Sequence, residues 1–90
     1  MLVKFFAYLR DYTDCSEIDV PAIPTVGDLI RNLGERYGPG LGGKLLTPDG
    51  ELGAEIVIMV NGRHVVHLGG IDAPLKEDDV VQIFPLVTGG

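Results

Sequence analysis

The residues best suited to chemistry are the last two, Gly89 and Gly90, at the end of the segment "FPLVTGG". Glycine has no Cβ, so this pair could enter a tunnel that is too narrow for other residues. The group delivered would be the Gly90 carboxylate, a poor electrophile that adenylation by ATP turns into an acyl donor. Sulfide chemistry could then convert it into a thiocarboxylate. The alternative is a frayed terminus, but fewer than about 1% of chains would end in Gly-Gly by chance.

The segment before the two glycines divides the chain into two parts. Pro85 has no backbone N–H, so we expect it to end the last strand of the fold. Leu86, Val87, Thr88 and the two glycines would then extend freely, with a reach on the order of 15 Å. We therefore predict a folded domain over residues 1–85 and a flexible C-terminal tail over residues 86–90.

A second candidate site consists of aromatic residues near both ends of the chain. If Gln82 faces water, alternation along the last strand turns Phe84 outward. If Lys4 faces water, the same alternation turns Phe6 and Tyr8 outward on the first strand. Should these strands be neighbours, the three rings would form an exposed apolar patch. Such a patch on a small acidic protein is typical of a protein interface, with scattered surface aromatics as the alternative.

Other motifs are better explained without chemistry. The run Gly38–Lys44 matches G-x-G-x-x-G, but phosphate loops of this kind lie between a strand and a helix, and here a helix comes first. His64 and His67 are three residues apart on an expected strand, so they would lie on opposite faces and share no metal. Cys15 has carboxylates on both sides, which disfavour a reactive thiolate. We predict no metal site and no catalytic constellation.

Composition limits the class of protein. The 90 residues carry a net charge of −6 with a pI near 4.6, so nucleic acid and anionic membrane surfaces are unfavourable partners, and a basic protein is a better one. The hydrophobic content of 46% is sufficient for a small globular domain. A single cysteine forms no intrachain disulfide, and no segment resembles a signal peptide or a membrane span. We expect a cytoplasmic domain.

The expected elements follow from hydrophobic periodicity. Strands are predicted over residues 2–9, 17–20, 56–60, 63–67 and 80–84, one helix over residues 25–37, and a loop with little regular structure over residues 38–54. Thr25 is the expected N-cap, Asn61-Gly62 the expected hairpin turn, and Leu75 a plug in the core. In the first strand, Ala7 and Leu9 are expected to face the core.

This order, β-β-α-β-β-β, predicts an α+β fold. One main helix packs across one face of a mixed sheet of about five strands, and a right-handed crossover places the last strand parallel to the first. This is the ubiquitin-like β-grasp arrangement.

Three segments of the chain carry a family resemblance. They are "Phe5-Phe6-Ala7", "Val60-Asn61-Gly62" and the terminal "Phe84-Pro85-Leu86-Val87-Thr88-Gly89-Gly90". Along essentially its whole length, the chain resembles the MoaD/ThiS family of sulfur carriers, and most closely its MoaD branch, the small subunits of molybdopterin synthase. The family has a β-grasp fold.

The resemblance implies a carrier that is not a catalyst by itself. A MoeB/ThiF-like enzyme would use ATP to adenylate Gly90, and a sulfur source would convert it to a thiocarboxylate. The protein itself would bind no cofactor. Val87, Thr88 and Gly89 would thread into a MoaE-like large subunit, in an expected heterotetramer, and supply sulfur to molybdopterin. The catalytic residues would belong to that partner. The expected partner interface comprises Phe6, Tyr8, Phe84, Pro85 and Leu86.

The chain departs from the family pattern at two tail positions. Leu86 stands where a second proline is common, and Thr88 stands where alanine is common. Three alternatives to the molybdopterin role therefore stay open. The chain could be a sulfur carrier for thiamine or cysteine synthesis, a ubiquitin-like modifier joined to lysines, or a β-grasp interaction module with an inert tail.

Overall fold

The computed structural model describes residues 1–86 of the 90-residue chain. The strands are β1 (Leu2–Phe5), β2 (Glu17–Asp19), β3 (Ile56–Val60), β4 (Arg63–His64) and β5 (Val80–Pro85). The helices are α1 (Arg10–Thr13), α2 (Val26–Tyr37) and α3 (Pro39–Leu45), with 3₁₀ turns η1 (Ala7–Leu9), η2 (Val65–His67) and η3 (Gly70–Asp72). Among these helices, none is long and apolar enough to cross a bilayer.

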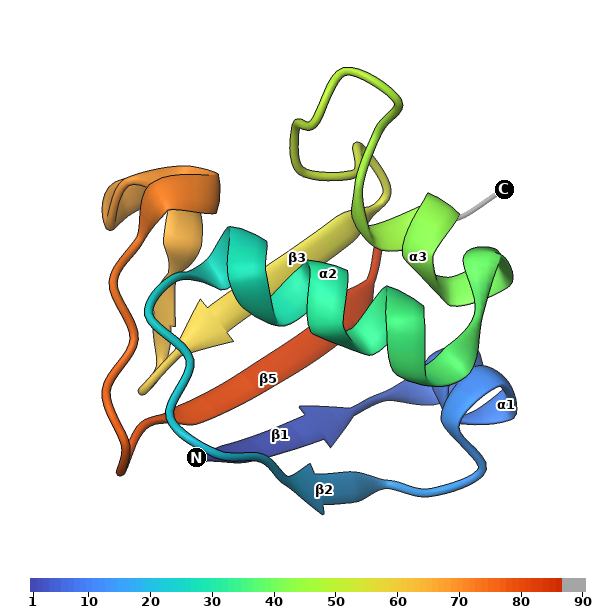
Figure 1. Ribbon diagram of the computed structural model, residues 1–90, viewed down its shortest axis with the longest axis horizontal. Coiled ribbons are helices and arrows are strands. Elements are labelled where there is room, and N and C mark those ends of the chain that lie inside the picture. Colours follow the sequence, from blue (N-terminus) through green and yellow to red (C-terminus); the bar gives the residue numbers. More distant parts are fainter. Residues whose placement is uncertain (87–90) are drawn as a thin grey trace.

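The strands form one mixed sheet in the order β2-β1-β5-β3-β4. β1 and β5 are parallel neighbours, and the other pairs are antiparallel. The helix α2 crosses one face of this sheet, and α3 lies on the same side (Figure 1). The predicted β-grasp order and the parallel pairing of the first and last strands are both confirmed.

The main helix begins where the sequence predicts. The Thr25 Oγ1 accepts a hydrogen bond from the Asp28 N–H at 3.2 Å, which satisfies one free donor of the first helical turn. Arg31 Nη2 donates to Asp28 Oδ1 at 2.9 Å, and Thr25 Oγ1 donates to Oδ2 at 3.0 Å. The Arg31 bond, followed by the Thr25 bond, holds the pKa of Asp28 below its usual value.

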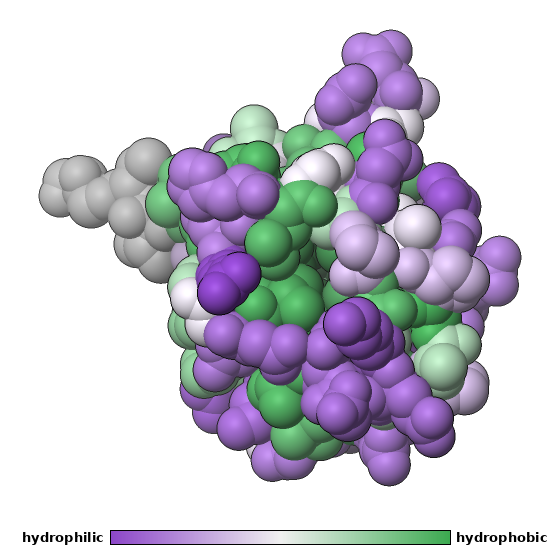
Figure 2. All heavy atoms as spheres, turned by 90° about the vertical axis from the view of Figure 1, so that its left-hand side faces the viewer, coloured by the Kyte–Doolittle hydropathy of each residue, from purple (hydrophilic) through white to green (hydrophobic). Residues whose placement is uncertain are grey.

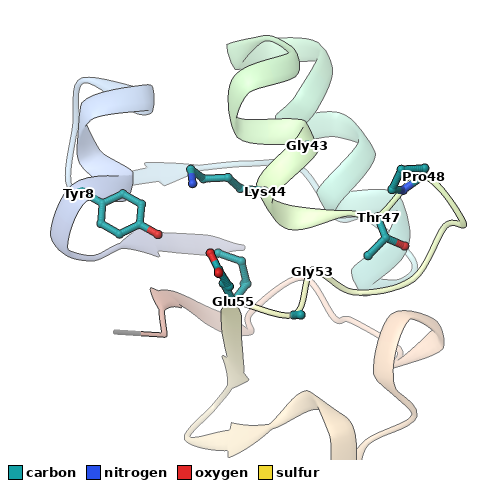
Figure 3. Close-up of a pocket in the computed structure, with 9 residues that line it drawn as sticks. Tyr8, Gly43, Lys44, Thr47, Pro48, Gly53 and Glu55 are labelled. Atoms are coloured by element: carbon teal, nitrogen blue, oxygen red, sulfur yellow. The ribbon is translucent and has the colours of Figure 1, made fainter. Parts of the chain in front are cut away.

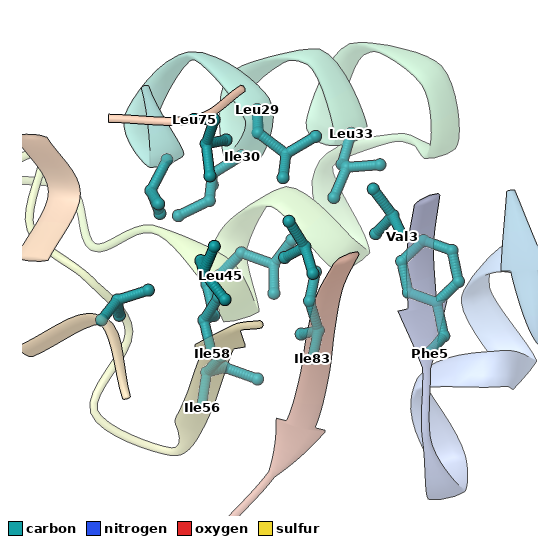
Figure 4. Packing of buried hydrophobic residues seen from close by; sticks show 14 of the residues in the cluster. Val3, Phe5, Leu29, Ile30, Leu33, Leu45, Ile56, Ile58, Leu75 and Ile83 are labelled. Carbon is teal, nitrogen blue, oxygen red and sulfur yellow. The ribbon is translucent and has the colours of Figure 1, made fainter. Parts of the chain in front are cut away.

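The hydrophobic core lies between the sheet and the two helices. Alternate residues of the strands point toward the buried stripe of α2, as Figure 4 shows. Leu75 is buried, so the predicted plug is confirmed. The largest side chains buried at this contact are Val3, Phe5, Leu29, Ile30, Leu33, Leu41, Leu45, Ile58 and Ile83.

The first strand is shorter than predicted. It ends at Phe5, and Ala7, the first residue of η1, takes a left-handed conformation with φ 54°. This turn carries Leu9 into the core by a different route from the predicted strand, and Leu9 is fully buried. Ala7 is exposed, so its predicted place in the core is wrong. Alternation along the strand therefore stops at Phe6.

The segment predicted as a loop contains the helix α3. Glycine disfavours helices, but Pro39 stands at the first helical turn, where its fixed φ is favourable. Leu41 and Leu45 are four residues apart, share one face and are fully buried. A Cβ on Gly42 would lie 3.2 Å from the Cα of Gly34 in α2, so the glycines allow the two helices to pack closely. Tertiary packing outweighs propensity here.

The hairpin after β3 also differs from its prediction. Asn61 and Gly62 form the expected turn with positive φ angles of 52° and 83°. The return strand β4 is only two residues long, however, because η2 follows it directly. His64 and His67 therefore lie side by side, with ring centroids 6.2 Å apart, and the prediction that they occupy opposite faces is wrong.

Candidate functional site

The tail leaves the sheet at the end of β5, next to the start of β3. Pro85 pairs with Ile56, so the last strand is one residue longer than predicted. In an antiparallel ladder, hydrogen-bonded and non-hydrogen-bonded residue pairs alternate. The Leu86 N–H donates to the Glu55 carbonyl at 2.7 Å, so the preceding pair, Pro85 with Ile56, is a non-hydrogen-bonded one and needs no N–H from proline. Pro85 is buried and Leu86 is exposed. The predictions for Val87–Gly90 lie outside the described residues.

The face of the sheet opposite α2 carries an apolar surface near this exit. Phe6 and Phe84 stack with ring centroids 4.3 Å apart and planes 14° apart. Both rings are half-buried, so the predicted juxtaposition is present, although the rings partly cover one another. By strand register, the same face carries four more half-buried apolar side chains, with the half-buried Lys4 and Gln82 between them. We call the apolar set the open-face patch: Leu2, Phe6, Val57, Met59, Val80 and Phe84.

Tyr8 does not extend the alternation that places Phe6 in this patch. The left-handed residue Ala7 turns the chain, so Tyr8 follows η1 instead of the strand. Its ring lies beneath the Lys44 ammonium, with Nζ 5.3 Å from the ring centroid. The predicted alternation is therefore wrong for Tyr8, which is 38% exposed and whose ring lies beneath a side chain of α3.

Tyr8 and Lys44 belong to a hollow beside the exit of the tail. It has a volume of about 370 Å³, and its wall includes Glu55 and Ile56, the residues that pair with Leu86 and Pro85. Figure 3 shows the polar ends of Tyr8, Lys44 and Glu55 on one side of the hollow. The exit of the tail is thus flanked by the open-face patch and by this hollow, which we call the exit hollow.

Sequence reasoning missed Lys44 and Glu55. Lys44 lies in the glycine-rich run that was expected to be a loop, and its position depends on α3. The available signal was the four-residue spacing of Leu41 and Leu45, which predicts a helix and would have placed Lys44 next to its buried face. Glu55 had no signal, because its role comes from the pairing with Leu86.

Cys15 lies away from this site. Its Sγ is 4.0 Å from the Tyr37 hydroxyl. Burial raises the pKa of Tyr37, and the contact with Cys15 raises it further. Within residues 1–86, no group of three His, Cys, Asp or Glu residues could hold a metal ion. The described residues therefore offer surfaces for a partner and a fixed starting point for the tail.

Comparison with known proteins places this geometry in a family. The sequence profile of the ThiS family matches residues 3–90. The chain belongs to the ThiS family. It is 40% identical over 90 residues to small archaeal modifier protein 3 of Haloferax volcanii, covering 98% of this chain and 96% of that one. It is 42% identical over 74 residues to a candidate sulfur carrier of Archaeoglobus fulgidus, covering 82% of each chain.

Solved structures support the same assignment for this ThiS-family protein. A chain of the BexX/CysO complex of Amycolatopsis orientalis superposes with a TM-score of 0.85 at 28% identity, covering 99% of this chain and 98% of that chain. The fold is the ubiquitin-like β-grasp, as predicted. The protein is thus a member of a group of sulfur carriers and ubiquitin-like small modifiers.

Proposed function

We propose that this ThiS-family protein carries sulfur as a thiocarboxylate on Gly90. We further propose that it donates this sulfur in molybdopterin synthesis, as the small subunit of molybdopterin synthase. The observation that carries the proposal is the stacked pair Phe6–Phe84 on the sheet face opposite α2, beside the point where a segment ending in Gly-Gly leaves the sheet. A partner that binds this patch would be positioned to receive the tail.

The chemistry needs no side chain of the carrier. A Gly90 carboxylate oxygen attacks the α-phosphate of ATP, pyrophosphate leaves, and an acyl-adenylate forms. Hydrosulfide then attacks the carbonyl carbon, the bond to AMP breaks, and loss of the proton leaves a thiocarboxylate. The folded domain would position the protein on its partner, and the tail would be long enough to bring Gly90 to the partner's active site. ATP would be consumed on the activating enzyme, with no cofactor bound to this chain.

Two partners follow from this scheme. The first is a MoeB/ThiF-like adenylating enzyme, and the second is a MoaE-like large subunit, with which the carrier would form a heterotetramer. The catalytic residues would lie in these partners. A relative that occurs in a complex, CysO with BexX, supports a function exercised through a protein partner.

Intact mass spectrometry tests the carrier function. The protein is incubated with the adenylating enzyme, ATP and a sulfide donor, and we expect exchange of one oxygen for sulfur at the C-terminus. Lack of exchange with a competent enzyme would reject the carrier function. Binding of a purified MoaE-like subunit, followed by sulfur transfer to the pterin precursor, would assign the pathway. Transfer only to a thiamine or cysteine pathway enzyme would replace that assignment.

A second candidate function has its own support. The relative with 40% identity over nearly the whole chain is a small archaeal modifier protein, which favours attachment of Gly90 to lysines of other proteins. Conjugates would appear as a ladder of higher-mass species in lysate. Deletion of Gly90 should abolish the ladder, and a lysate with no conjugates would exclude this candidate in favour of the carrier. If neither reaction occurred, the remaining explanation would be an interaction module.

The variant Phe84→Asp tests the open-face patch. It places a charge in an apolar surface, so we expect affinity for the large subunit to fall at least about tenfold. The ring lies on the outer face of the sheet and is outside the buried core, so the free energy of unfolding should fall by only about 1–2 kcal/mol. The measurements are calorimetric titration and chemical denaturation.

Val66→Asp is the matched control. Val66 is 57% exposed in η2, and the substitution changes polarity and charge in the same way. The orange segment that contains η2 lies on the left of Figure 1, the side that faces the viewer in Figure 2. We expect it to bind the large subunit like the original protein. Equal loss in both variants would reject the open-face patch as the specific interface.

A further inference from the structure

We propose that the exit hollow is a second docking surface, which receives an acidic side chain of the adenylating enzyme. This inference rests on the proposed function and adds a contact that the tail and the open-face patch do not provide. The residues that carry it are Lys44 and Tyr8, with Gly43 and Gly53 in the wall of the hollow. Glu55 is in the same wall, but its carboxylate forms no ion pair with Lys44, and its part in the argument is the backbone bond to Leu86.

The first argument is that the Lys44 ammonium is held in place but not neutralised. Within residues 1–86 the Lys44 ammonium has no carboxylate within 4.0 Å, as is true of every Lys and Arg there except Arg31. It lies over the ring of Tyr8 instead, 5.3 Å from the centroid. Cation–π contact holds the charge in place without neutralising it. A positioned and unneutralised ammonium in a hollow is suited to bind an incoming carboxylate.

The second argument is the place of the hollow. Its wall includes Glu55 and Ile56, which pair with the last two described residues, Leu86 and Pro85. An enzyme that takes hold of the tail must therefore approach this wall. Gly43 and Gly53 leave the wall without bulky side chains, so a loop of the partner can come close to the backbone (Figure 3).

The third argument concerns which partner and which charge. A basic partner would favour the acidic surface as a whole, but at the hollow it would face Lys44. A carboxylate there would pair with Lys44 and could accept a hydrogen bond from the Tyr8 hydroxyl. All the carrier pathways discussed above require adenylation of Gly90 first, so the adenylating enzyme is the partner common to them.

The test is the carrier-dependent exchange of pyrophosphate into ATP, catalysed by the purified MoeB/ThiF-like enzyme. We expect Lys44→Glu to raise the KM for the carrier about tenfold, with kcat little changed, because the reversed charge repels the partner carboxylate. Lys44→Arg keeps the charge and can stack on Tyr8, so its KM should stay within about twofold. The penalty for Lys44→Glu should shrink as salt concentration rises.

Lys76→Glu is the matched control, since it makes the same charge change on an exposed turn before the start of β5, at the other end of this strand from the hollow. We expect this variant to retain the KM of the original protein. Equal KM values for the two glutamate variants, or a lower KM for Lys44→Glu, would overturn the inference while the proposed function stands. Absence of exchange with the unmodified carrier would reject both. Thermal denaturation should show that all variants are folded.

Discussion

Replacing Gly53 with alanine should destabilise the protein by about 3 kcal/mol or more and lower its melting temperature by on the order of 15 °C. A Cβ at this position would lie 2.0 Å from the carbonyl oxygen of Lys44 and 3.1 Å from its carbonyl carbon. These are backbone atoms at the end of α3, so no side-chain rotation relieves the clash. The Gly53 N–H also donates to the Leu45 carbonyl at 2.9 Å, and this bond would be lost if the segments moved apart.

Gly43→Ala is the matched control in the same wall of the exit hollow. A Cβ on Gly43 meets no atom within 4 Å, and the residue lies within α3. Alanine is a better helix former than glycine, so this variant should be more stable by up to about 1 kcal/mol. Urea denaturation of the two variants measures whether the free energy of unfolding falls for Gly53→Ala and rises for Gly43→Ala. A Gly53→Ala protein as stable as the original would show that α3 does not pack against this segment as described.

The sequence predicted the sheet well where strands are paired on both sides. β5 lies between β1 and β3, so hydrogen bonds on both edges keep it extended, and simple alternation placed Val81 and Ile83 inside and Phe84 outside. β1 lies between β2 and β5, and alternation held along it as well. Alternation failed only after the strand had ended, where Ala7 has a positive φ. Alanine gives no local signal for that conformation, and the reason for it, the burial of Leu9, lies in the rest of the fold.

The helix α3 shows why the exit hollow, with Lys44, could not be predicted from the sequence. Local propensity counts the glycines of this segment against a helix, whereas the close contact of Gly34 with Gly42 turns them into an advantage. That contact exists only once α2 and α3 are folded together. The meeting of Lys44 with Tyr8 depends on α3 and on the turn at Ala7, so neither residue type nor spacing could have predicted it.

Replacing Gly89 with valine should lower the rate of thiocarboxylate formation about 100-fold, because the added side chain displaces the reacting carboxylate in a site built for glycine. Residue 89 follows β5 in the sequence, in the segment predicted to be a tail, so we expect the free energy of unfolding to change by less than about 0.5 kcal/mol. Single-turnover reactions with adenylating enzyme, ATP and sulfide, followed by intact mass, measure the rate. Chemical denaturation measures the stability.

Thr88→Val is the matched control for this prediction. Threonine and valine are both branched at Cβ and similar in volume, so the change adds no bulk one residue before Gly89. We expect Thr88→Val to react at nearly the original rate, which would show that a change in the tail without added bulk is tolerated. If Gly89→Val also reacted at the original rate, the two glycines would not be needed to pass through a narrow tunnel in the partner. The carrier's specificity would then have to come from the open-face patch and the exit hollow, whose variants would become the decisive ones.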